Sequence, residues 1–212
     1  MKSPKAIFVT GIGTGIGKTV CSSVLCTAFD ADYWKPIQAG DLSSTDTNFI
    51  EKNASLTDAH IWEERFALRY AMAPHKAAQL EGVELSVADL DLPELQNHCF
   101  IEGAGGCMVP LNDKETFIDF AKTYSLSTIL VVKNYLGSIN HTLLSLEVLK
   151  QRGIDVLGIV IMGSENKASE EAYINFSGVE ILGRIDWSSN LDRFFIKDQA
   201  EKFKANLKKA LF

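Results

Sequence analysis

A glycine-rich segment that ends in a lysine and a threonine stands near the start of the chain. It runs G-I-G-T-G-I-G-K-T from residue 11 to residue 19, and its last two residues are Lys18 and Thr19. Glycines let backbone N–H groups approach phosphate oxygens, a lysine ammonium meets the terminal phosphates, and a threonine hydroxyl reaches Mg²⁺. These residue types in this order predict a loop that binds a nucleoside triphosphate together with magnesium.

The spacing and the surroundings of this segment support that interpretation. Five residues separate Gly11 from Gly17, whereas the common phosphate loop has four, so this loop is of a variant class. The apolar residues 7–9 precede it, and the helix-compatible residues 19–29 follow it. Because strand, loop and helix in that order are the context that the motif needs, we favour phosphate binding over a glycine-rich turn that binds nothing.

Three charged residues further along the chain could act at the same phosphates. Lys35 lies near the end of a predicted strand, 31–37, and Glu102 ends another, 99–102, before the glycines of E-G-A-G-G. Ligands of open α/β sheets bind beyond the carboxyl ends of strands, so we expect Lys35 near phosphate and Glu102 near Mg²⁺. Asp46, in T-D-T, is either a metal ligand or a residue favoured at a helix N-terminus. For Lys35 the alternative is a solvated lysine.

Composition and charge restrict the class of protein. The chain has 212 residues, 46% hydrophobic and 23% charged, and we expect residues 1–212 to form one globular domain. With 21 basic and 27 acidic residues the net charge is −6, which argues against nucleic acid or an anionic membrane as a partner. No apolar run approaches the ~18 residues that span a bilayer, and no secretory signal is recognised, so a cytoplasmic location is expected. The four cysteines lack a C-x-x-C pair and are expected to be buried thiols.

Helices and strands are predicted to alternate along the chain. The predicted helices are 19–29, 45–53, 73–80, 116–124, 138–152, 167–176 and 198–211, and the later strands are 128–133, 156–162 and 179–185. Residues 85–95 show no clean period and are expected to be loop with short turns. This alternation predicts an α/β fold of the P-loop NTPase type, with a mostly parallel sheet flanked by helices on both faces.

The helix predicted over 138–152 begins within L-G-S-I-N-H. Ser138 is expected to cap it, and Ile139 is expected to begin its apolar face. Asn140 and His141 fall in its first turn, where polar residues are most often surface residues.

The motifs together resemble the dethiobiotin synthetases, which are ATP-dependent cyclo-ligases of biotin biosynthesis. The matching segments are the five-spaced loop ending in G-K-T, K-P-I-Q-A-G, T-D-T, A-P-H, E-G-A-G-G with V-P-L, L-G-S-I-N-H and L-G-R-I-D-W. They occur in the family's order over residues 6–187. The resemblance implies a homodimer that converts 7,8-diaminononanoate, CO₂ and ATP into dethiobiotin, ADP and phosphate, through a carbamate and its anhydride with phosphate.

The resemblance also implies a role for each residue of the site. Lys18 and Lys35 would be catalytic, stabilising charge on the γ-phosphate and the carbamate, and Mg²⁺ would lie among Thr19, Asp46 and Glu102. ATP would bind Gly13, Thr14, Gly15, Ile16, Gly17, Lys18, Thr19 and Val20, and the diamine would bind near Thr14, Lys35, Gly105 and Gly106. The diamine's tail carboxylate would bind across the dimer interface to Asn140 and the backbone of Leu136, Gly137, Ser138 and Ile139.

Three residues depart from the family's pattern. Ala39 stands where many members have a hydroxyl residue, and Gly15 stands where many have an acidic residue. Met162 stands where an asparagine usually contacts adenine, and a methionine cannot pair with a base edge. We therefore expect ATP as co-substrate, with a looser choice among nucleoside triphosphates.

Other classes of phosphate-loop protein fit the sequence less well. A cobyrinic acid type synthetase normally has an added glutaminase domain, for which 212 residues leave no room. A partition or septum-site ATPase, whose nucleotide state switches its dimerisation, usually has an extra lysine early in the loop, and residues 11–15 contain none. A small-molecule kinase would more often have the four-residue spacing and a basic lid.

Overall fold

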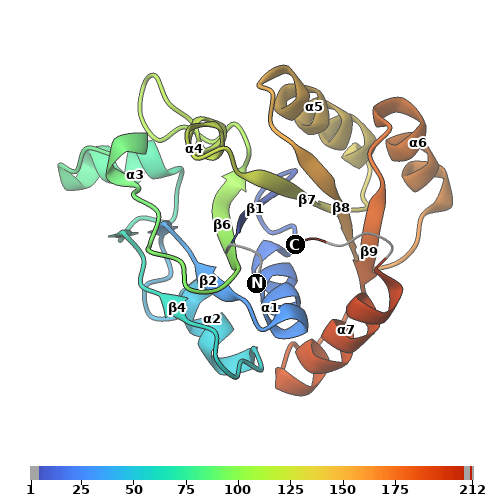
Figure 1. The fold of residues 1–212 in the computed structure, drawn as a ribbon. Coiled ribbons are helices and arrows are strands. Elements are labelled where there is room, and N and C mark those ends of the chain that lie inside the picture. Colours follow the sequence, from blue (N-terminus) through green and yellow to red (C-terminus); the bar gives the residue numbers. More distant parts are fainter. Residues whose placement is uncertain (1–4, 208–210, 212) are drawn as a thin grey trace.

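The central sheet has seven parallel strands in the residues that the structure, a computed structural model, describes, namely 5–207 and 211 (Figure 1). Its strands, in the order in which they lie across the sheet, are β4 (Ile61–Trp62), β2 (Asp32–Trp34), β6 (Cys99–Gly106), β1 (Ala6–Gly11), β7 (Ser127–Lys133), β8 (Val156–Met162) and β9 (Ile181–Ile185). A separate parallel pair joins β3 (Ile37–Ala39) to β5 (Phe66–Leu68). Because the seven strands are parallel, their carboxyl ends share one edge, where ligands of α/β proteins bind.

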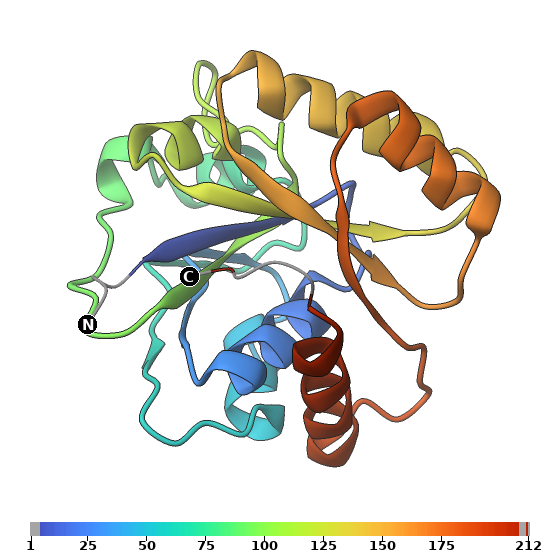
Figure 2. The ribbon, with the colours of Figure 1, turned by 45° about the vertical axis from the view of Figure 1, so that its right-hand side comes forward.

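Helices cover both faces of this sheet (Figure 2). On one face lie α1 (Lys18–Phe29), α2 (Asp46–Asn53) and α7 (Arg193–Asn206), and on the other lie α3 (Pro74–Glu81), α4 (Phe117–Thr123), α5 (Ser138–Gln151) and α6 (Lys167–Ser177). The residues of β1 alternate between the two cores, since Ile7 and Val9 pack under α1 while Phe8 packs on the opposite side. A strand that is buried on both faces is apolar throughout. The predicted α/β fold is confirmed.

The segment predicted as one strand over 31–37 is interrupted. β2 ends at Trp34 and β3 begins at Ile37, with Pro36 between them. Proline has no N–H to donate to a strand ladder, and beyond it the chain leaves the main sheet to pair with β5. Lys35 therefore directly follows β2, at the carboxyl edge of the main sheet.

β6 extends to Gly106, beyond the end that we predicted at Glu102. Val9 of β1 pairs with Glu102 and Gly11 pairs with Gly106, so the register between the two strands shifts in this interval. The extra residues make β6 bulge beside the phosphate loop. The glycines of E-G-A-G-G therefore belong to a bulged strand and not to a loop.

The last helix differs from the prediction at both ends. α7 begins at Arg193 instead of 198, and the side chain of Asp192 caps it. Asp198 lies inside the helix, where it pairs with Lys202 at 2.7 Å. The helix ends at Asn206, so the prediction is wrong at 207 and at 211, and its residues 208–210 lie outside the described residues.

Smaller differences concern short elements. The sequence did not predict β4 and β5, because two or three residues are too few to show a period. The prediction of loop with short turns over 85–95 is confirmed, since η1 (Val87–Asp89) is a single 3₁₀ turn. None of the helices within residues 5–207 combines the length and the apolar character that crossing a bilayer requires.

Candidate functional site

The loop between β1 and α1 has the geometry of a phosphate-binding loop. Gly15 and Gly17 have φ angles of 68° and 101°, in the region that favours glycine, and Gly17 is the N-cap of α1. The first helical hydrogen bond runs from the N–H of Cys21 to the carbonyl of Gly17. The N–H groups of residues 18–20 therefore have no acceptor within the helix, and together with the helix dipole they favour an anion at this position.

Lys18 lies over this loop with its charge only partly compensated. Its side chain is buried, and Nζ donates a hydrogen bond to the carbonyl of Gly13 at 3.0 Å. Burial lowers the pKa of Lys18 to about 8, although the nearby carboxylate of Glu102 opposes this effect. An anion bound against the ammonium would favour its charged form, so the loop and Lys18 are suited to phosphate.

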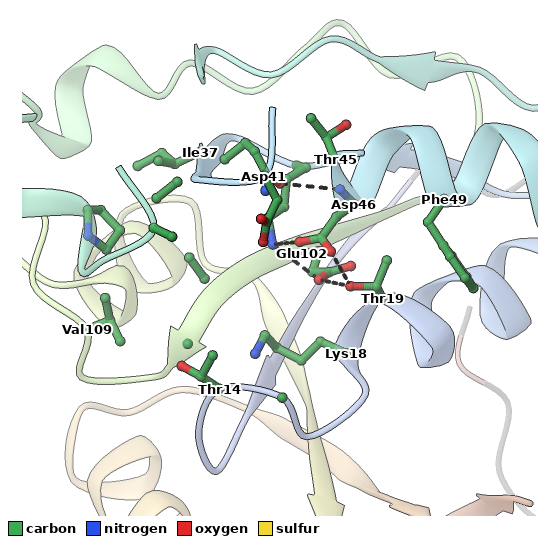
Figure 3. Close-up of a pocket in the computed structure, with 18 of the residues that line it drawn as sticks. Thr14, Lys18, Thr19, Ile37, Asp41, Thr45, Asp46, Phe49, Glu102 and Val109 are labelled. Carbon is green, nitrogen blue, oxygen red and sulfur yellow. Dashed lines mark hydrogen bonds and ion pairs between the residues drawn. The ribbon is translucent and has the colours of Figure 1, made fainter. Parts of the chain in front are cut away.

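A partly buried cluster of polar groups lies next to Lys18. The hydroxyl of Thr19 bonds both Asp46 and Glu102 (dashed lines in Figure 3); it lies 2.7 Å from Oδ1 of Asp46 and 2.9 Å from Oε1 of Glu102. Nζ of Lys35 lies 2.6 Å from Oδ2 of Asp46 and 3.2 Å from Oε1 of Glu102. The cluster joins the start of α1, the end of β2, the start of α2 and the middle of β6.

The charges in this cluster hold each other in place. Burial disfavours the charge of Lys35, but the carboxylates of Glu102 and Asp46 raise the pKa of Lys35 above its usual value. Burial also opposes ionisation of Asp46, but the ammonium of Lys35 holds the pKa of that carboxyl below its usual range. Lys35 and Asp46 are therefore both charged at neutral pH.

The oxygen atoms of this cluster are donors of the kind that Mg²⁺ prefers, but they do not form a closed cage of protein ligands around a metal ion. Thr19, Asp46 and Glu102 offer one hydroxyl and two carboxylates. Mg²⁺ usually binds through one or two carboxylates together with phosphate oxygens and water. Within the described residues no group of three or more His, Cys, Asp or Glu side chains could hold a metal ion. The donor set therefore suits a magnesium ion shared with a nucleotide.

The phosphate loop and the polar cluster line a cleft of about 780 Å³ at the carboxyl edge of the sheet. Figure 3 shows part of this cleft. Its lining consists of Thr14, Gly15, Gly17, Lys18, Thr19, Val20, Lys35, Ile37, Gln38, Ala39, Asp41, Ser44, Thr45, Asp46, Phe49, Ala71, Met72, Ala73, Pro74, Glu102, Ala104, Gly105, Val109 and Leu191. The glycines of E-G-A-G-G approach the phosphate loop closely. A Cβ on Gly105 would lie 3.5 Å from Oγ1 of Thr14, and a Cβ on Gly106 would lie 3.3 Å from the carbonyl oxygen of Gly11.

Most of the predicted site residues meet in this cleft. Three that do not line it belong to its two glycine-rich segments: Gly13 accepts the hydrogen bond from Lys18, Ile16 is buried beneath the loop, and Gly106 packs on the backbone of Gly11. The residues 136–140 are separate from the cleft within the chain.

The start of α5 lies on the surface. Leu136 is fully exposed and Ile139 is 38% exposed, so the prediction that Ile139 faces inward is wrong. Gly137, with a φ of 102°, is the N-cap in place of Ser138, whose hydroxyl is buried 2.9 Å from that of Tyr173. Asn140 lines a different hollow, a groove of about 560 Å³ beside α5 and α6.

Two residues that we did not predict as part of the site complete the cluster around Lys35, namely Tyr33 and Gln38. The hydroxyl of Tyr33 donates to Oε2 of Glu102 at 3.0 Å, and the side chain of Gln38 accepts from the N–H of Asp46 at 3.4 Å. Tyr33 had no sequence signal, because a tyrosine in an apolar strand is typical of a core residue, whereas Gln38 belongs to the K-P-I-Q-A-G segment. Pro74, in A-P-H, was part of the family pattern, and it lines the cleft.

Solved structures with a similar fold include ATPases of two kinds. The cell division ATPase MinD of Pyrococcus furiosus has a TM-score of 0.59 over 96% of this chain and 99% of its own, at 14% identity. A ParA family ATPase of Chlorobium tepidum has a TM-score of 0.53 over 93% and 98% of the two chains, at 10% identity. At such low identity the likeness concerns the fold alone.

Sequence relatives are far more similar. Residues 5–194 match a family model described as an AAA domain. An ATP-dependent dethiobiotin synthetase BioD of Christiangramia forsetii is 46% identical over 96% of this chain and 98% of its own length. Proteins of the same name from Cytophaga hutchinsonii and Rhodopseudomonas palustris are 45% and 41% identical, over 84% and 88% of this chain and 86% and 88% of their own lengths. The chain therefore belongs to the ATP-dependent dethiobiotin synthetase family, as its motifs predicted.

Proposed function

We propose that this chain converts 7,8-diaminononanoate, CO₂ and ATP into dethiobiotin, ADP and phosphate. Membership of the dethiobiotin synthetase family supports the reaction. The structural observation that carries the proposal is the junction of two glycine-rich segments at Thr14 and Gly105, beside Lys18 and the cluster around Lys35. A second substrate in the cleft would lie directly beside the phosphates at this junction.

The reaction needs an enzyme that positions reactants and neutralises charge. One amine of the diamine adds to CO₂ and loses a proton, giving a carbamate. A carbamate oxygen attacks the γ-phosphorus and ADP leaves, and the second amine then attacks the carbonyl carbon and displaces phosphate, which closes the ureido ring. The transfer of the phosphoryl group brings two anions together, the carbamate and ATP, so fixed positive charges at the reacting groups lower its barrier.

In this proposal the two lysines act on different anions. ATP binds residues 13–20, with Lys18 at its terminal phosphates, where the anion restores the charge that burial disfavours. Lys35 keeps its charge through its contacts with Asp46 and Glu102, and it faces the γ-phosphate and the carbamate. Thr19, Asp46 and Glu102 hold Mg²⁺, which neutralises phosphate oxygens when it is bound.

The diamine occupies the cleft beside Thr14, Lys35 and the backbone of residues 105 and 106. The closeness of Gly105 to Thr14 supports this assignment, because an amine held there lies within reach of the phosphate loop. Ala39 also lines the cleft, where many family members have a hydroxyl, so one hydrogen bond to substrate or phosphate is either missing here or made by another group.

We propose further that the protein is a homodimer and that the partner's residues 136–140 bind the tail carboxylate of the diamine. In its own chain this segment is separate from the cleft, and its apolar residues Leu136 and Ile139 are exposed. Exposed apolar side chains beside Asn140, which lies outside the cleft of its own chain, favour a protein–protein interface. Asn140, with the backbone of Leu136 to Ile139, would then complete the cleft of the other subunit.

The state of the cysteines supports a cytoplasmic location, which is part of the proposal. All four cysteines are free and buried, as predicted, and free thiols are typical of proteins from reducing compartments.

Direct product analysis tests the proposed function. The protein would be incubated with Mg-ATP, bicarbonate and 7,8-diaminononanoate, and dethiobiotin would be sought by mass spectrometry. We expect dethiobiotin and phosphate in equal amounts, both lost when the diamine is omitted. Lys18→Ala serves as the control for contaminating activity. Phosphate release that does not depend on the diamine would overturn the synthetase assignment and favour the alternative class, an ATPase whose nucleotide state switches its dimerisation.

A further inference from the structure

A buried tyrosine that does not line the cleft contacts the carboxylate of Glu102. Tyr33 of β2 is 0% exposed, and its hydroxyl donates to Oε2 of Glu102 at 3.0 Å. The other oxygen of this carboxylate, Oε1, accepts from Thr19 at 2.9 Å and from Lys35 at 3.2 Å. The two oxygens of Glu102 therefore have different partners, one from the core and the others from the site.

The core fixes where this hydroxyl lies. Tyr33 pairs with Phe100 across the parallel strands β2 and β6, and the two rings belong to the core beneath α1. Glu102 comes two residues after Phe100, so its side chain points to the same face of the sheet. Because the tyrosine ring is packed on this face, its hydroxyl is a preorganised donor for the carboxylate.

The direction of this hydrogen bond follows from the two groups. A carboxylate oxygen only accepts hydrogen bonds, so the hydroxyl of Tyr33 is the donor to Oε2 of Glu102. A core tyrosine needs one acceptor for its hydroxyl, but here the acceptor is a group that also contacts Thr19 and Lys35.

We propose that Tyr33 is a positioning residue for the magnesium site. By holding Oε2, it fixes the carboxylate plane of Glu102 so that Oε1 stays directed at Thr19 and the cleft. This inference rests on the proposed function, in which Glu102 is a ligand of Mg²⁺. Partners that orient a metal ligand commonly change metal affinity by about 10–100-fold when they are removed.

The test is a magnesium titration of the Tyr33→Phe variant. Isothermal titration calorimetry would measure Mg²⁺ binding to protein saturated with a non-hydrolysable ATP analogue. We expect the affinity for Mg²⁺ to fall about tenfold, with the affinity for the nucleotide in excess Mg²⁺ little changed. Tyr124→Phe is the matched control, because it removes a tyrosine hydroxyl that bonds Asp91 at 3.4 Å, away from the cleft.

A double-mutant cycle tests whether Tyr33 acts through Glu102. In a Glu102→Ala background the Tyr33→Phe change should have no further effect on Mg²⁺ affinity. If Tyr33→Phe does not fold, 4-aminophenylalanine at position 33 retains a donor and should bind Mg²⁺ like the natural protein, whereas 4-fluorophenylalanine should not. Unchanged Mg²⁺ affinity in folded Tyr33→Phe, or the same loss in both backgrounds, would overturn the inference. The titration contains no diamine, so its result is separate from that of the product analysis.

Discussion

Lys18 and Lys35 are both buried, but their surroundings shift the pKa values of the two lysines in opposite directions. The ammonium of Lys18 contacts a carbonyl, and burial lowers its pKa to about 8. The ammonium of Lys35 contacts two carboxylates, which raise its pKa in spite of burial. Lys18 therefore responds to an arriving anion, whereas Lys35 is a constant charge that also holds Asp46 and Glu102 together.

Replacing Lys35 should affect both the rate and the stability. Lys35→Ala leaves Asp46 and buried Glu102 without their cation, and breaking such a pair costs about 3 kcal/mol of unfolding free energy. The catalytic barrier should rise by roughly 2–4 kcal/mol if the ammonium stabilises transition-state charge. Urea unfolding and steady-state kinetics measure the two effects.

The stability loss in Lys35→Ala should shrink when Mg²⁺ is added, because the metal ion supplies positive charge to the same oxygens. Lys122→Ala removes an exposed lysine from α4 and should change neither quantity appreciably. Near-normal turnover in Lys35→Ala would remove this lysine from the catalytic site.

Met162 bears on the choice of nucleotide. It ends β8 and packs against the phosphate loop, since a Cβ on Gly17 would lie 3.0 Å from its Cε. A thioether is a weak acceptor and no donor, so it cannot select adenine by hydrogen bonding. We expect GTP and CTP to support dethiobiotin formation with kcat/KM values within about tenfold of that for ATP. A strict preference for ATP in a competition assay would contradict this expectation.

The chemistry of the site was largely predictable from residue types, but its fine geometry was not. Glycine, lysine and threonine in the phosphate loop have fixed tasks, so Lys18 and Thr19 were identified by their spacing. The contact of Asp46 with Lys35 depends on how α2 lies against β2, and the sequence left a structural role for Asp46 open. Tyr33 was not identified because the acceptor of its hydroxyl, Glu102, is distant in the sequence.

At the scale of elements, side-chain bonds connect the start of α5 to α6 and β9. Tyr173 of α6 bonds both Ser138 and Asn134, and Asn134 donates to Oε1 of Glu170 at 3.1 Å. Arg184 of β9 donates to Oε2 of Glu170 at 2.6 Å. Apart from Ser138, the segment 136–140 is thus exposed, but it rests on a partly buried polar network, which gives it a defined shape.

This network predicts a pH dependence of stability. Burial opposes ionisation of Glu170, but hydrogen bonds from Arg184 and from the N–H of Asn166 hold its pKa below the usual 4.5. A carboxyl with a depressed pKa stabilises the fold above its unfolded pKa, and this contribution is lost as the pH falls through the folded value. Glu170→Gln should therefore cost about 2 kcal/mol of unfolding free energy near pH 7.

The difference between Glu170→Gln and the natural protein should shrink as the pH falls below 4.5. Urea unfolding at a series of pH values measures it. Glu165→Gln is the matched control, because that side chain is exposed just before α6. A difference that stays constant down to pH 3 would assign the effect of Glu170→Gln to packing instead of charge.

Element boundaries show what the sequence could not decide. Both Asp192 and Asp198 are good N-cap residues, and we predicted the later start for α7. In the structure Asp198 instead pairs with Lys202 one turn ahead, which is the i, i+4 arrangement of a helix interior. The very short strands β4 and β5 form because neighbouring strands offer hydrogen bonds, and no local pattern specifies them.

At the scale of the whole molecule, a chain of net charge −6 must bind the polyanion ATP, together with CO₂ and a diamine that carries a carboxylate tail, in the proposed reaction. Attraction over long distances does not help, so the positive charges must lie within the cleft itself. Lys18 and Lys35 provide them in one chain, but the carboxylate tail of the diamine needs a further polar site. In the proposal that site is Asn140 of the other subunit.

The Asn140→Ala variant distinguishes binding of the diamine's tail carboxylate from the chemical steps of the reaction. The asparagine would bind a carboxylate that does not react, so its loss should raise the KM for the diamine about tenfold and leave kcat nearly unchanged. Initial rates over a range of diamine concentrations measure both constants. An unchanged KM would contradict the assignment of Asn140 to the substrate's tail.

Mixed dimers decide whether the site is shared between subunits. When Lys18→Ala and Asn140→Ala chains combine, a composite site places both changes in one cleft of the heterodimer and leaves the other cleft native. Random pairing of equal amounts should then restore about a quarter of the native sites, measured at diamine concentrations far below the KM of Asn140→Ala. If each cleft used its own chain's Asn140, every cleft would carry one change, and the mixture would give no more than the mean activity of the two variants.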